Sequence, residues 1–199
     1  MIDREKALQQ LAGIKISGDP NGNLEAFDEP VTFLPTQFWN SYSGKILKRV
    51  KEDPSLRAEV EAGLEAAAAE YGYHTGHALI GSTNFRKIID PMVENESEDL
   101  LYGLYTLFAA LGWGNPVITE LSQTRMVVTA DSYYESEIGE FVKVEKGAAY
   151  LMKGISRACM DLIFGEPYPN GLGTFECVQA RSKELGDSFA EFIVTARGG

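Results

Sequence analysis

Apolar residues recur at intervals of three and four along four stretches of the chain, the spacing of helices that bury one face. This pattern predicts helices over residues 36–50, 55–78, 94–112 and 144–162. Thr36 and Ser55 are the expected N-caps of the first two helices. Asp53-Pro54 separates these two helices, and Gly165 stops the last one.

The period changes to two in four shorter runs rich in β-branched residues, which predicts strands. The runs are Val117–Leu121, Arg125–Ala130, Thr174–Ala180 and Ser188–Thr195. Each pair is joined by a connection short enough for a hairpin. Helices and hairpins alternate without repeated βαβ units, so the expected fold class is α+β, an antiparallel sheet of about four strands packed against helices.

The first 35 residues are rich in turn signals, such as Gly18-Asp19-Pro20 and Asp28-Glu29-Pro30, around short apolar pieces. We expect an extended N-terminal arm over residues 1–35, laid on a single domain that spans residues 36–199. A chain of 199 residues fits one hydrophobic core.

Charge narrows the range of partners. The chain carries 18 Lys and Arg against 29 Asp and Glu, a net charge of −11, so its field repels phosphate backbones and anionic lipid surfaces. We therefore expect neither nucleic acid nor a membrane as a partner. The opening sequence MIDREKALQQ has no apolar core of a secretory signal, and two cysteines, Cys159 and Cys177, make no disulfide framework. The expected location is the cytoplasm, with both thiols free and inert.

Nucleotide cofactors require a glycine-rich turn between a strand and a helix. Gly171-Leu172-Gly173 and Gly112-Trp113-Gly114 both lack the third glycine, and no P-loop lysine pattern occurs. We expect no cofactor. His74 and His77 lie three residues apart on a predicted helix and could share a metal, but the spacing favours histidines of a core or pocket, with His74 turned toward the core beside Tyr71.

Two predicted helix surfaces near aromatic residues carry pairs of glycines, which have no side chain and let other groups approach closely. The pairs are Gly72 with Gly76, and Gly147 with Gly154. Spacing alone favours tight helix packing over ligand binding, yet tyrosines give an apolar cavity the polar groups that orient a ligand. We expect a pocket between these helices and the sheet, covered by residues 105–113. The candidate ligand-binding residues are Tyr71, Tyr73, His74, His77, Tyr105, Trp113 and Tyr150.

Four segments in this order resemble the 4-vinyl reductase domain family over residues 36–196: Glu70–Gly76, Asp131–Glu135, Tyr150–Gly154 and Gly186–Phe192. That family is related to the sensor domains of phenol-responsive transcription activators and, distantly, to TRAPP vesicle-tethering subunits. The resemblance implies this ligand-binding fold and a cavity for a small molecule.

Family members typically bind zinc through one cysteine before the last helix and through Glu-x-x-Cys and Gly-Asp-x-x-Cys runs. Here the corresponding positions fall near Glu145 and on Gln179, Ser182 and Ala190. Serine and alanine offer no thiolate, so we expect no zinc. The position of the tryptophan that lines the pocket of the phenol sensors falls near Thr129 in this chain. The resemblance therefore does not imply that the ligand is phenol itself.

The leading hypothesis is a non-catalytic domain that binds a small apolar or aromatic molecule as a sensor or carrier. One alternative is an enzyme or accessory protein of tetrapyrrole vinyl reduction, and another is a structural dimerisation module. A homodimer is expected because related domains usually pair and because one early helix carries a bulky apolar stripe. The stripe consists of Phe38, Trp39, Tyr42 and Ile46.

Overall fold

The computed structural model describes residues 2–32 and 34–198. Its helices are α1 (Arg4–Ala12), α2 (Thr36–Arg49), α3 (Pro54–Gly81), α4 (Thr83–Ile89), α5 (Glu96–Ala110) and α6 (Tyr150–Phe164). Its strands are β1 (Leu24–Ala26), β2 (Glu29–Val31), β3 (Gly114–Leu121), β4 (Arg125–Tyr133), β5 (Phe175–Arg181) and β6 (Ala190–Ala196). Short 3-10 turns cover Asp90–Met92, Ile138–Glu140 and Lys183–Leu185.

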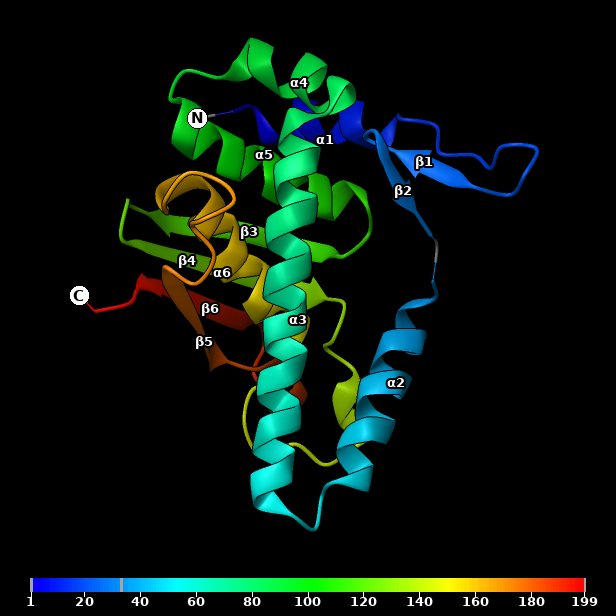
Figure 1. Ribbon diagram of the computed structural model, residues 1–199, viewed down its shortest axis with the longest axis vertical. Helices are drawn as coiled ribbons and strands as arrows, with labels where there is room; N and C mark the ends of the chain where they lie inside the picture. The colour runs from blue at the N-terminus through cyan, green and yellow to red at the C-terminus, as the bar shows by residue number, and fades with distance from the viewer. Residues whose placement is uncertain (1, 33, 199) are drawn as a thin grey trace.

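The larger sheet has the strand order β3-β4-β6-β5, with every neighbouring pair antiparallel. β1 and β2 form a separate two-stranded hairpin. The predicted α+β class and four-stranded antiparallel sheet are confirmed. In Figure 1, α6 lies between the sheet and the long helix α3, while α5 contacts β3. Within the described residues, every helix is too short or too polar to cross a bilayer.

Helix α3 starts one residue before the predicted cap. Asp53, not Ser55, is the N-cap, and its carboxylate accepts bonds from the backbone N–H groups of Ser55 and Leu56, both at 3.0 Å. Pro54 occupies the first helical position, where its missing N–H costs nothing. Ser82 then ends α3 and caps α4 through Phe85 N at 3.3 Å. The sequence pattern missed α4 because a helix of seven residues spans too few turns to show a period.

Helix α6 begins at Tyr150, so the prediction of a helix from residue 144 was wrong for its first turns. A carboxylate from another segment sets the start: Glu135 accepts bonds from Leu151 N at 2.9 Å and Met152 N at 3.1 Å. Val144 and Ala148 keep apolar spacing because they pack beside Leu47 in a smaller core cluster, not because they are helical.

The glycines of α3 and α6 allow these two helices to pack closely. A Cβ at Gly154 would lie 2.5 Å from Glu65 O and 2.6 Å from Ala68 Cβ, and one at Gly72 would lie 3.2 Å from Ile155 Cα. A Cβ at Gly76 would lie 2.8 Å from Leu162 Cδ1. These positions therefore serve helix packing.

The N-terminal stretch is more ordered than the expected extended arm. Residues 4–12 form α1, capped by Asp3, which accepts from Lys6 N at 3.0 Å. Ala7, Leu11 and Phe27 are buried in the main core cluster, and α1 packs on α5. The expectation of extended chain was therefore wrong for residues 4–12, while the division into arm and domain stays a prediction. The β1–β2 hairpin projects from this end of the molecule and leads into α2 (Figure 1).

Candidate ligand-binding site

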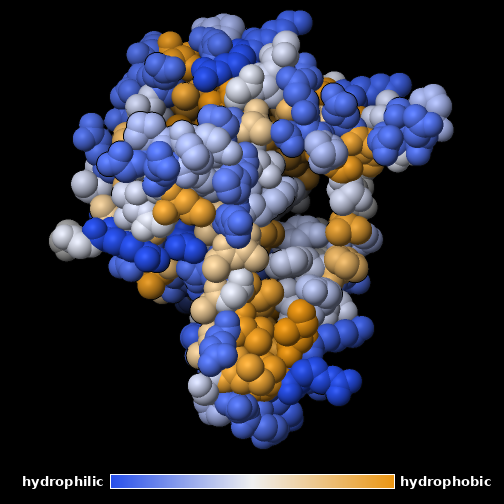
Figure 2. Space-filling model, viewed as in Figure 1, coloured by the Kyte–Doolittle hydropathy of each residue, from blue (hydrophilic) through white to orange (hydrophobic). Residues whose placement is uncertain are grey.

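A cavity of about 500 Å³ lies beside α3 and adjoins the face of that helix that packs on α6, since Ala68 lines the cavity and also faces Gly154. Several separate segments supply its walls: the chain just after the hairpin, α2, α3, the loop after α5, the turn after β4, and α6. On the face in Figure 2 the surface is hollowed between α3 and the N-terminal end of α2. The lining residues are Thr32, Leu34, Trp39, Ala67, Ala68, Tyr71, Leu111, Gly112, Trp113, Tyr134 and Leu151.

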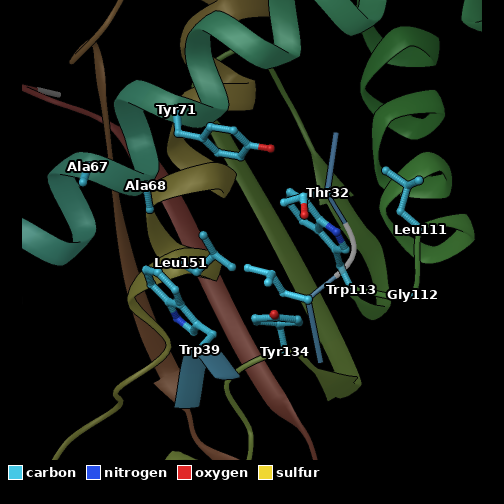
Figure 3. A pocket seen from close by; sticks show the side chains of 11 residues that line it. Thr32, Trp39, Ala67, Ala68, Tyr71, Leu111, Gly112, Trp113, Tyr134 and Leu151 are labelled. Carbon is cyan, nitrogen blue, oxygen red and sulfur yellow. The ribbon is translucent and has the colours of Figure 1, made fainter. Parts of the chain in front are cut away.

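Apart from Thr32, which has a hydroxyl, these lining side chains are apolar or aromatic, and none is a carboxylate, amine, guanidinium or imidazole. The hydroxyl of Tyr71 points into the cavity from α3 (Figure 3). Burial raises the pKa values of Tyr71 and Tyr134, so both phenols stay protonated at neutral pH and can donate hydrogen bonds. The cavity thus offers an apolar space with a few neutral polar groups, the usual composition of a small-molecule site.

A second apolar cavity of about 440 Å³ lies under the β1–β2 hairpin and shares Thr32, Tyr71, Leu111 and Trp113 with the first. The Tyr71 and Trp113 rings form the shared wall, with centroids 6.4 Å apart. Trp113 also stacks on Phe108 at 5.3 Å and 6°, which fixes the indole between the two spaces. Tyr71 is 48% exposed, so the wall is open to solvent on one side.

Two glycines with positive φ set the position of Trp113. Gly112 has φ +79° and Gly114 has φ +135°, a region that L side chains rarely adopt. A Cβ at Gly114 would overlap the carbonyl oxygen of Ser132 on β4. The turn therefore requires glycine at both sides of the tryptophan, and this is why the Gly-Trp-Gly sequence places an indole between α5 and β3.

A buried carboxylate lies behind the cavity wall. Glu135 is fully buried and accepts a bond from Trp39 Nε1 at 3.2 Å, in addition to the two N–H groups at the start of α6. Trp39 and Leu151 both line the cavity, so one carboxylate joins α2 to α6 beside it. Desolvation raises the pKa of Glu135 to about 7, while the three hydrogen bonds oppose that shift.

Of the seven residues expected from sequence, Tyr71 and Trp113 lie together at the cavity. Tyr73, His74 and His77 lie elsewhere, around the loop after α6. His77 stacks on Tyr168 at 3.8 Å and 2°, and His74 Nδ1 lies 3.0 Å from the Tyr168 hydroxyl. Tyr73 is buried and its hydroxyl accepts a bond from Gly171 N at 2.9 Å. His74 is exposed, so the prediction that it faces the core was wrong.

Tyr105 and Tyr150 line neither of the two large cavities. Tyr105 is buried and donates to Ser156 Oγ at 2.9 Å, between α5 and α6. Tyr150 is buried in the smaller core cluster with Leu47, and Lys153 Nζ lies over its ring, 5.1 Å from the ring centroid. Both hydroxyls have raised pKa values, because burial disfavours the phenolate.

The positions that the family resemblance assigns to zinc hold a hydrogen-bonded network. Gln179 accepts from Ala149 N at 3.1 Å and donates to Glu184 Oε1 at 3.0 Å, and Asp187 accepts from Ser182 N at 2.8 Å. Among the described residues, no group of three His, Cys, Asp or Glu is arranged to hold a metal ion. Cys159 and Cys177 are buried and unbonded to one another, and burial raises the pKa of the Cys159 thiol to about 12.

Several cavity residues were missed by sequence reasoning: Thr32, Leu34, Trp39, Tyr134 and Leu151. Trp39 was placed on the expected dimer stripe. One feature of the sequence could have indicated that Trp39 turns inward: a buried tryptophan needs a partner for its N–H. That partner, Glu135, is far away in sequence and could not be found from the helix alone.

No protein-family model and no curated protein matches this sequence. Among solved structures, the chain is similar to the phenol-responsive sensory domain of the transcription activator PoxR with phenol, at a TM-score of 0.74 and 8% identity. The match covers 98% of this chain and 90% of that one. A trafficking protein particle complex subunit 3 from Naegleria fowleri, covalently bound to palmitic acid, matches at a TM-score of 0.48 and 17% identity, over 81% of this chain and 95% of that one. At 8% identity, the likeness to the PoxR sensory domain shows that the chain has the same fold.

Proposed function

We propose that this protein binds a small apolar or aromatic molecule as a sensor or carrier domain of the 4-vinyl reductase type, without catalysis. The observation that carries the proposal is the cavity of about 500 Å³ among Trp39, Tyr71 and Trp113. Its volume falls within the range of about 300–1,000 Å³ that ligand sites occupy. The phenol bound by the similarly folded sensory domain supports the same class of ligand.

The lining sets the ligand's chemistry. A charged group would lose its hydration in this cavity and find no ion of opposite sign among the described lining residues. An aromatic ring, by contrast, gains stacking on the indoles and buries its surface. A neutral molecule with one or two rings fits both requirements.

A ligand would act on the rest of the domain through Trp39 and Leu151. Both residues line the cavity, and both are held by the Glu135 carboxylate, one through its indole and the other through its backbone N–H. A ligand that shifts Trp39 therefore shifts α2 relative to the start of α6. This link is the part of the proposal that makes the domain a sensor.

We also propose a homodimer through the exposed face of α2. Phe38 and Tyr42 are 48% and 51% exposed, and their rings stack with centroids 6.1 Å apart. Leu34, just before α2 in the sequence, is exposed as well. Trp39, the third aromatic residue of the expected stripe, instead faces the cavity.

A fluorescence titration tests the ligand site. Trp39 and Trp113 are the two tryptophans of the sequence and both line the cavity, so indole emission reports on that space. Phenol and butylphenol should change the emission of the wild-type protein in a saturable way. Ala67→Phe fills the cavity from α3. It should weaken the binding of butylphenol at least about tenfold, because the ligand can then bury less apolar surface.

Ala66→Phe is the matched control, because Ala66 is the exposed neighbour on the same helix and does not line the cavity. It should bind butylphenol as the wild type does. Equal binding by both variants, or no saturable change in any of the three proteins, would refute the site.

A further inference from the structure

A third cavity, of about 190 Å³, adjoins the apolar one and shares Gly112, Trp113 and Tyr134 with it. Its remaining lining is mostly polar: Asn40, Gly114, Ser132, Tyr133, Ser136 and Glu137. No lysine, arginine or histidine is among the described residues that line it. An apolar space therefore opens next to a small space rich in hydrogen-bond acceptors.

Asn40 is the residue of this lining with an unused polar atom. Its side chain is 1% exposed, and its Nδ2 donates to the backbone oxygen of Tyr134 at 3.0 Å. That bond fixes which end of the amide is the oxygen, since only the nitrogen can donate to a carbonyl. Asn40 Oδ1 is buried and has no hydrogen-bond partner among the described residues.

A buried acceptor without a partner costs free energy, and it favours whatever group brings a donor to it. Tyr133 does not fill this role, because its hydroxyl is engaged by Glu184 and Gln179. Glu137 adds a second acceptor at the same cavity and would repel an anion. The chemistry that fits is thus a hydroxyl or amine, and a carboxylate does not fit.

We propose that this cavity takes the polar end of the ligand, a hydroxyl or amine that donates to Asn40 Oδ1, while the ring lies between Trp39, Tyr71 and Trp113. The inference rests on the proposed function and adds a polar end to the ring, a neutral or cationic donor that lies outside the apolar cavity, beside Glu137. Asn40 is then the residue that selects among ligands with the same apolar body.

The test compares ligands that share a phenylbutyl body: phenylbutanol, phenylbutylamine, phenylbutyrate, butylbenzene and the methyl ether of phenylbutanol. Titrations follow the emission of the two cavity tryptophans. In the wild type, the alcohol should bind about fivefold tighter than its ether, which keeps the oxygen but has no donor. Phenylbutyrate should bind weakest. Whether the amine or the alcohol is preferred identifies the kind of donor.

Asn40→Leu should weaken binding of the alcohol and the amine about fivefold, because their donor loses its acceptor, and should leave binding of butylbenzene unchanged, because it has no donor to lose. The bond from Asn40 to Tyr134 O is lost for every ligand alike. A purely structural effect would weaken all ligands equally. Ser43→Ala is the matched control: Ser43 lies one turn further along α2 and does not line the cavity, and its buried hydroxyl also has no partner in residues 2–32 and 34–198.

The inference is overturned if the wild type binds the ether as tightly as the alcohol, or if Asn40→Leu weakens butylbenzene as much as the alcohol. The comparison of alcohol and ether in the wild type decides the matter even where the leucine variant fails to fold. If butylbenzene binds and the donors give no advantage, the ligand site stands and the role of Asn40 falls. If none of the five binds, the proposed function falls and takes this inference with it.

Discussion

Glu135 holds Trp39 and the first turn of α6 through a single buried carboxylate, and its raised pKa gives this contact a pH dependence. The folded state binds the proton up to a pH of about 7, whereas the unfolded chain loses it near 4.5. Raising the pH through this window therefore lowers the free energy of unfolding, by on the order of 3 kcal/mol from this group.

Glu135→Gln stays neutral at every pH and should lack this contribution. Urea denaturation measures this effect. As the pH rises from 4.5 to 7, the free energy of unfolding of the wild type should fall relative to that of the variant. Glu140→Gln, an exposed carboxylate nearby, should follow the wild type. Parallel curves for the wild type and Glu135→Gln would show that burial does not raise this pKa.

Residue-level prediction from sequence placed several candidate residues on α3 but did not predict which face of that helix is buried. Tyr71 and Tyr73 were both expected at the ligand, yet residues two apart on a helix point in nearly opposite directions. The buried face follows Gly72, Tyr73 and Gly76, not Tyr71 and His74. The preceding stretch, residues 66–69, is four alanines and therefore gives no apolar phase to decide between the two faces.

At the scale of elements, the contact between α3 and α6 is the closest approach of two helices that the glycines reveal. Gly154→Ala should destabilise the protein by about 1–3 kcal/mol, because the new Cβ meets the backbone of α3 and the helices must separate. Gly63→Ala should instead stabilise it by about 0.5–1 kcal/mol, since Gly63 lies in α3 with no atom close to an added Cβ.

Chemical denaturation of both variants measures the two effects with the same change of side chain. A Gly154→Ala protein as stable as the wild type would mean that α3 and α6 do not approach as closely as described.

Elements whose signals are local were predicted well, and those set by distant groups were not. The hairpins β3–β4 and β5–β6 follow from alternation and short connections. The start of α6 depends on Glu135, which lies 16 residues before the N–H that it caps, and no periodicity reports such a contact. The sequence pattern missed α1 because only Ala7 and Leu11 of its nine residues are buried, which is too few to show an apolar stripe.

At the scale of the whole molecule, the cavity exists because segments spread between Thr32 and Leu151 meet beside α3. The resemblance implied a cavity, but its walls could not be listed from the sequence. Trp39 lies in α2, whereas Thr32, Trp113 and Tyr134 lie in three different connecting segments, and only the tertiary arrangement brings them together (Figure 3).

The exposed aromatic face of α2 makes a prediction about assembly. Light scattering at micromolar concentration should give twice the chain mass of 21.9 kDa. Phe38→Glu should shift the protein to the monomer mass, because a charge at the centre of the stacked Phe38–Tyr42 pair cannot be buried without a partner. A wild-type protein that scatters as a single chain would rule the dimer out.

The central claim is that the space between Trp39, Tyr71 and Trp113 binds the ligand, and a crystal structure of the protein with butylphenol tests it most directly. The account predicts one butylphenol molecule per chain, with its ring against the two indoles and its hydroxyl toward Tyr71 or Asn40. Butylphenol bound instead beside Tyr168 and His77, or a cavity closed by its own side chains with no molecule inside, would contradict the account.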